Sequence, residues 1–221
     1  MKEEQVSMQI ETIPLWTVNV HKIHIKEWPL VKDKFLSLIP WDDINQRKNK
    51  SARKKINDEE YEMTWTDYFI QGAENSDSYV MTNFGINLKT PVKYINTSAQ
   101  YEPIFLSMIS PYLREFLKIS DYKFSEVGRV WTQRYSKGDY HAPHDHGPEG
   151  FACVFYAELD PEEHDVTEFM QPWIPHTGSR DMGCPDDVEE GDLVIFPINL
   201  FHMAPPHNSE KYRTIISFNL T

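Results

Sequence analysis

The chain has 221 residues, enough for one substantial domain, and carries a net charge of -12 from 34 acidic and 22 basic side chains. This charge argues against nucleic acid as a partner, because phosphate binding needs a surplus of Lys and Arg on the binding face. Two cysteines, no signal-peptide pattern and no run of ~20 apolar residues favour a cytoplasmic protein that binds no membrane.

In the N-terminal half, the sequence predicts a strand and helices with less regular segments between them. A β-branched stretch over residues 10–20 predicts a strand, and apolar residues at helical spacing predict a helix over 30–39. The basic run 47–55 predicts a solvated loop or a short exposed helix, with a nucleic-acid or nucleotide-phosphate contact as the alternative. An apolar stripe over 104–117 predicts a helix packed on a sheet, which Pro111 either kinks or divides in two.

The C-terminal part reads as strands between loops rich in Pro, Gly and Asp. The candidate strands lie within residues 124–135, 150–159, 164–170, 192–202 and 212–220. We therefore expect a single domain over 1–221, in which 1–122 form a helical and strand support region and 123–221 form a mainly β core, an all-β barrel or sandwich with flanking N-terminal helices.

The stretch "HAPHDHG", residues 141–147, carries the clearest chemical signal. Side chains alternate along a strand, so His144 and His146 can face one ion while Asp145 points away. His141 lies three residues earlier, and we place it outside the ligand set. For an isolated H-x-H pair, a polar surface turn is the alternative interpretation.

A second histidine and an arginine lie near the C-terminus. If the chain turns near residues 206–208, His202 lies across from Arg213 on the returning strand. Along that strand, Ile215, Ser217 and Asn219 share the face of Arg213. The guanidinium group offers a planar fork for a carboxylate, so this pair could hold a metal with a dicarboxylate beside it.

These segments together resemble a known family. The runs "RYSKGDYHAPHDHG", "GFACVFYAEL" and "GDLVIFPINLFHMAPP…YRTIISFN", within residues 129–220, are similar to the double-stranded β-helix (jelly-roll, cupin-like) core of the 2-oxoglutarate (2OG)- and Fe(II)-dependent oxygenases, closest to the small oxygenases of marine bacteriophages and bacteria. The resemblance implies iron ligands at His144 and His202. It implies a 2OG carboxylate site formed by Arg213, with Tyr135, Tyr156 and Ser217 beside it.

The chain departs from the family pattern at His146, where most members carry Asp or Glu. We place His146 in the metal and catalytic set with His144 and His202, and keep Asp145 or Glu149 as alternatives. Three neutral imidazoles make the site more cationic and suit zinc or copper as well as iron.

The resemblance implies a dioxygenase that uses Fe(II), 2OG and O₂ to hydroxylate an aliphatic carbon, releasing succinate and CO₂. Its substrate would be a small molecule or a peptide, and a homodimer is compatible with the sequence. Aromatic residues from Trp65 to Phe84, and Trp173, are expected as walls of a substrate cleft or as core. The alternatives are a three-histidine cupin-type metalloenzyme that does not use 2OG, and a non-catalytic, metal-stabilised binding module.

Overall fold

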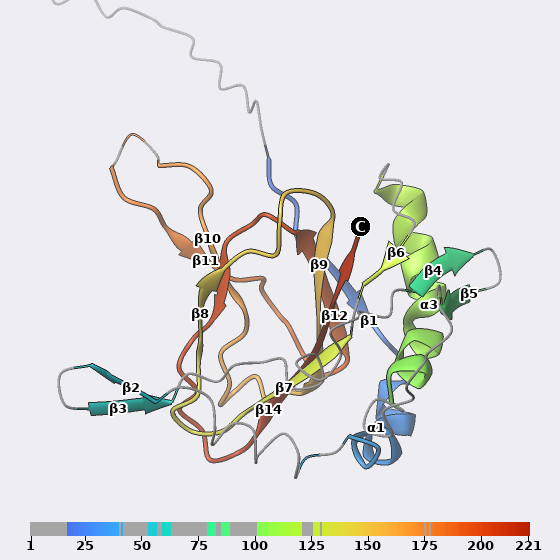
Figure 1. Cartoon of the computed structure of the whole chain (residues 1–221), viewed down its shortest axis with the longest axis horizontal. Helices are drawn as coiled ribbons and strands as arrows, with labels where there is room; N and C mark the ends of the chain where they lie inside the picture. The colour runs from blue at the N-terminus through green and yellow to red at the C-terminus, as the bar shows by residue number, and fades with distance from the viewer. Residues whose placement is uncertain are drawn as a thin grey trace, which may run out of the picture.

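The described part of the chain forms two larger antiparallel sheets and a separate two-stranded one, with helices on the outer face of the largest sheet (Figure 1). The computed structural model describes residues 17–39, 41, 101–120, 126–128, 130–174, 176 and 178–221, and the backbone alone of residues 53–56, 59–62, 79–82 and 85–88. None of the helices that lie in these residues is long and apolar enough to cross a membrane.

The larger sheet has the order β1-β12-β9-β14-β6-β4-β5, and β7 also pairs with β14. Its strands are β1 (His21–His24), β4 (Tyr79–Thr82), β5 (Gly85–Leu88), β6 (Glu126–Val127), β7 (Trp131–Tyr135), β9 (Phe151–Glu158), β12 (Asp192–Pro197) and β14 (Arg213–Leu220). The helices beside it are α1 (Trp28–Leu36) and α3 (Tyr101–Ile119).

The smaller sheet has the order β11-β10-β13-β8 and carries two of the predicted metal ligands. Its strands are β8 (His141–His144), β10 (Glu168–Met170), β11 (Met182–Gly183) and β13 (His202–Ala204). A separate hairpin joins β2 (Arg53–Ile56) to β3 (Glu59–Glu62).

Strand β9 shows how the sequence builds the two layers of core. Val154 and Tyr156 face a cluster between the sheets, whereas Cys153 and Phe155 face the helices. All four are buried, because β9 lies in the middle of the larger sheet with apolar layers on both sides. On the helix side, the Trp28 ring packs edge-on against Phe155 at 4.8 Å between centroids. This packing holds β9 and its neighbours as a rigid wall for the cavity.

The predicted fold class is confirmed, as the chain is mainly β with antiparallel sheets and flanking helices. The helix predicted over 104–117 is confirmed and runs through Pro111 without a break. The other predicted helix is found as α1, slightly earlier than expected.

Two N-terminal predictions are wrong within the described residues. Residues 17–20 form no strand, and the strand lies at β1 instead, because pairing with β12 fixes its position. The end of the basic run enters the β2–β3 hairpin rather than a helix or loop, in a register that sets Arg53 opposite Glu62 and Lys55 opposite Glu60. Each C-terminal candidate segment contains a strand, and two segments hold two each: 124–135 holds β6 and β7, and 192–202 holds β12 and the start of β13.

Candidate metal centre

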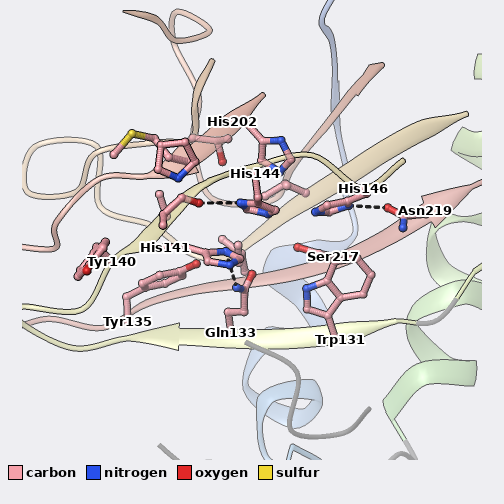
Figure 2. A pocket seen from close by; sticks show the side chains of 17 residues that line it. Trp131, Gln133, Tyr135, Tyr140, His141, His144, His146, His202, Ser217 and Asn219 are labelled. Carbon is pink, nitrogen blue, oxygen red and sulfur yellow. Dashed lines mark hydrogen bonds between the residues drawn. The ribbon is translucent and has the colours of Figure 1, made fainter. Parts of the chain in front are cut away.

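Three histidines bring their ring nitrogens together at one end of the space between the sheets (Figure 2). His144 ends β8 and lies directly opposite His202 on the neighbouring strand β13. His146 follows β8, and its backbone N–H donates to the carbonyl oxygen of Ile198 at 3.0 Å. One ligand nitrogen from each ring lies within 4.8 Å of the other two. The two histidines of the H-x-H motif and the distant third histidine, His202, thus lie together in the folded chain.

Each of the three rings has a partner for Nδ1. In His144 and His202, Nδ1–H donates to the carbonyl oxygen two residues earlier, at 2.8 and 2.9 Å. In His146, Nδ1–H donates to the side-chain oxygen of Asn219 at 2.9 Å. A neutral imidazole whose proton is on Nδ1 has its lone pair on Nε2. These hydrogen bonds therefore leave three Nε2 lone pairs, the form in which histidine binds a metal.

Burial favours the uncharged form of the three rings. The pKa of His202 is lowered to about 3, mainly by burial and also by the neighbouring His144 and His146. Burial also lowers the pKa of His144 and of His146. Neutral nitrogen ligands in this number suit a divalent ion such as Fe(II) or Zn(II), so the residues present fit the metal that the sequence predicts.

Neither alternative carboxylate joins this group. Asp145 is exposed, and its side chain accepts a hydrogen bond from the backbone N–H of Gly147 at 3.2 Å. Glu149 is also exposed and lies outside the cluster of ligand atoms. His141 is outside the cluster too, as expected, but its ring lies only 4.0 Å from that of His144.

The histidines open into a cavity of about 500 Å³. Of the four residues predicted to share one face of β14, Ile215, Ser217 and Asn219 line this cavity, whereas Arg213 is not among its lining residues. The other lining residues are Trp131, Gln133, Tyr135, Tyr140, His141, Ala142, Pro143, His144, His146, Val154, Thr167, His202, Met203 and Ala204. Among these described residues none is Asp, Glu, Lys or Arg. Trp131 and Gln133 were missed, although alternation with Tyr135 along β7 indicates their shared face.

Arg213 does not lie across from His202, so that prediction is wrong. The connection after β13 carries the chain from the smaller sheet to the larger one, where Arg213 pairs with Tyr135. Arg213 is buried, with its guanidinium carbon 4.3 Å from the centre of the Tyr135 ring. Its two terminal nitrogens donate to the backbone carbonyls of Asp165 and Pro205.

Two neighbouring donors nevertheless lack partners where Tyr135 lines the cavity, beside Arg213. Arg213 Nε and the Tyr135 hydroxyl are buried and have no hydrogen-bond partner among the residues that the structure describes. Burial raises the pKa of Tyr135, so its hydroxyl keeps its proton at neutral pH. Because a buried donor without an acceptor is costly, this pair fits an anionic group such as a carboxylate.

Only some of the remaining predicted site residues line the cavity. Ser217 lines the cavity, but Tyr156 does not; the Tyr156 hydroxyl donates to the side-chain oxygen of Thr167 and accepts from its backbone N–H. Trp173 is 47% exposed and does not line the cavity either. The side chains from Trp65 to Phe84 lie outside the described residues.

Comparisons with known proteins give one family model and several similar solved structures. A family model described as "Putative 2OG-Fe(II) oxygenase" matches residues 129–219. No curated protein matches the chain. Similar solved structures include a prolyl-4-hydroxylase from Pseudomonas putida (11% identity, TM-score 0.45, covering 92% of this chain and 88% of that one). A prolyl hydroxylase from Trichoplax adhaerens, in complex with a peptide fragment of hypoxia inducible factor, has 9% identity and a TM-score of 0.47, covering 92% and 84%. Residues 129–219, which hold the three histidines and most of the cavity lining, are thus similar to the 2OG-Fe(II) oxygenases, enzymes that use Fe(II), 2OG and O₂.

Proposed function

We propose that the protein is a dioxygenase that hydroxylates an aliphatic carbon of its substrate. The reaction consumes 2OG and O₂: one oxygen atom enters the new C–OH group, the other enters succinate, and CO₂ leaves. The observation that carries the proposal is the convergence of three Nε2 lone pairs in a cavity that also reaches Tyr135, beside Arg213. Bound iron would supply the oxygen chemistry, while the protein orients the organic molecules and excludes water.

In this proposal, His144, His146 and His202 hold the iron. Arg213 Nε–H and the Tyr135 O–H donate to the distal carboxylate of 2OG, which would satisfy both of these buried donors. Ser217, which is buried and lies opposite Trp131, lines the cavity at the histidine end and offers a further polar group to the bound molecules there.

The volume and lining of the cavity indicate which class of substrate it can hold. Its volume of about 500 Å³ suits a small molecule, or one side chain of a peptide, in addition to 2OG. The described lining offers aromatic rings and neutral hydrogen-bonding groups, which supports recognition by shape and hydrogen bonds rather than by ion pairs. We therefore propose a small-molecule or peptide substrate bound beside the histidines.

The decisive experiment adds Fe(II) and 2OG to the protein without oxygen. A 2-oxo acid chelated to Fe(II) gives a visible metal-to-ligand charge-transfer band, and its growth with 2OG concentration gives the Kd. We expect a saturable band from 2OG and none from succinate, which lacks the oxo group. No band at saturating Fe(II) and 2OG would refute the proposal.

The same band tests the carboxylate site. Arg213→Lys keeps the charge but loses the planar fork, so we expect 2OG to bind roughly 10- to 100-fold more weakly while metal affinity stays within about twofold. Arg180→Lys, on the exposed β10–β11 connection, is the matched control. If Arg213→Lys binds 2OG like the wild type, Arg213 is not the carboxylate partner.

A metalloenzyme that does not use 2OG is the second candidate. It is favoured by the third imidazole in place of a carboxylate, and by the two carbonyl groups that already engage the terminal nitrogens of Arg213. In that case the metal would bind, but 2OG would neither produce the band nor change the metal affinity.

A further inference from the structure

His141 lies in the cavity, close to the metal centre but outside it. It begins β8, three residues before His144, and its ring faces the cavity with the other labelled side chains in Figure 2. Its Nδ1 lies 3.4 Å from the side-chain nitrogen of Gln133 on β7, so this hydrogen bond spans the two sheets.

Gln133 fixes the position of this pair along the cavity. On β7, Trp131, Gln133 and Tyr135 all face inward, one every second residue. Trp131 marks the histidine end, because its ring lies 5.5 Å from that of His146. Tyr135 marks the end at Arg213. Gln133 and its partner His141 therefore lie between the metal centre and the proposed site of the distal carboxylate.

The hydrogen bond to Gln133 also sets which nitrogen of His141 carries the proton. The amide nitrogen can only donate, so Nδ1 of His141 accepts and Nε2 carries the hydrogen. This is the reverse of His144, His146 and His202, whose Nδ1 atoms donate. With a proton on Nε2, His141 cannot offer that nitrogen to a metal, but it can donate a hydrogen bond into the cavity.

We propose that His141 Nε2–H donates to the carboxylate of 2OG that adjoins the 2-oxo group, making His141 a further cosubstrate-binding residue. The inference rests on the proposed function. The His141 ring lies 4.0 Å from the His144 ring, beside the end of 2OG that would bind the metal, and the described lining offers no charged side chain there. A neutral N–H held by Gln133 supplies a fixed donor there without further charge.

The test measures 2OG binding and metal binding separately in two variants. For each variant, the anaerobic charge-transfer band gives the Kd for 2OG, and titration of the metal-free protein with Fe(II) gives the metal affinity. His141→Phe removes the donor, and we expect the Kd for 2OG to rise roughly 10- to 100-fold with metal affinity within about twofold of wild type. His141→Gln restores a side-chain N–H donor, and we expect it to recover most of the affinity for 2OG.

His176→Phe, which makes the same exchange at an exposed position, should bind both ligands like the wild type. Equal 2OG affinity in His141→Phe and wild type would overturn the inference, and so would loss of metal binding, which would make His141 a metal ligand. If the wild type itself gives no band, the proposed function fails together with the inference. A wild-type band with no change in His141→Phe refutes the inference alone.

Discussion

Asn219 offers a direct test of whether His146 is a metal ligand. Its side-chain oxygen accepts the Nδ1–H of His146 at 2.9 Å, and this contact fixes both the ring orientation and the proton position. Asn219→Leu keeps a side chain of similar size but removes the acceptor. The His146 ring can then rotate, and its proton can move to Nε2, the nitrogen that faces the other two histidines.

The expected loss of metal affinity follows from the role of hydrogen-bond partners at metal-binding histidines. Removing the hydrogen-bond partner of a metal-binding histidine typically weakens metal binding 10- to 100-fold, or about 1.4–2.7 kcal/mol. We expect this loss for Fe(II) or Zn(II), measured by calorimetry or by competition with a coloured chelator on the metal-free protein. The fold should persist, since the backbone of Asn219 remains paired with Ala152 within β14 and β9.

Two further variants separate the hydrogen bond from other effects of the substitution. Asn219→Asp keeps an oxygen acceptor and adds a negative charge, so its metal affinity should equal or exceed that of the wild type. Asn208→Leu makes the same exchange at an exposed site and should change nothing. Metal affinity in Asn219→Leu within twofold of the wild type would refute the reasoning, because His146 would then either not bind the metal or not need Asn219.

Three other predictions concern stability. The pKa of His202 is about 3 in the folded protein and near 6.5 in the unfolded chain, so only the unfolded chain gains this proton as the pH falls from 6.5 toward 3. Urea unfolding of the metal-free protein should therefore show stability falling by up to about 1.4 kcal/mol per pH unit per such histidine. Trp28→Ala empties a fully buried site and should cost about 3–5 kcal/mol in the same assay. Gly150→Ala should lower the melting temperature, with a cost of about 3 kcal/mol, because Gly150 has φ +117° and a Cβ atom would overlap the carbonyl oxygen of Leu220.

The sequence predicts the strands and the inward faces well, because both depend on local alternation. The pattern of β14 places Ile215, Ser217 and Asn219 on one face, and all three line the cavity. The H-x-H spacing likewise brings His144 and His146 to one side. Residues two apart on an extended chain share a face whatever the strand pairs with, so neither prediction requires knowledge of the tertiary structure.

Strand pairing is where prediction from local pattern failed. The expected hairpin would set His202 beside Arg213, but β13 joins the smaller sheet and β14 joins the larger one. Nothing in the turn sequence distinguishes a hairpin from a connection that crosses between sheets. The hydrogen bond between His146 and Asn219 joins residues 73 positions apart, so it too can be identified only in the folded chain.

The third imidazole changes the charge balance of the proposed site rather than its geometry. In a site with one carboxylate ligand, the protein cancels one of the two charges of the metal. Here His144, His146 and His202 are held neutral by burial, and the exposed Asp145 is engaged by Gly147. No acidic residue lines the described part of the cavity. The full charge of a bound divalent ion must then be balanced by the molecules that enter, which favours anionic ligands. A dianion such as 2OG meets that demand, so the histidine in place of a carboxylate is compatible with 2OG chemistry and makes the site more dependent on it.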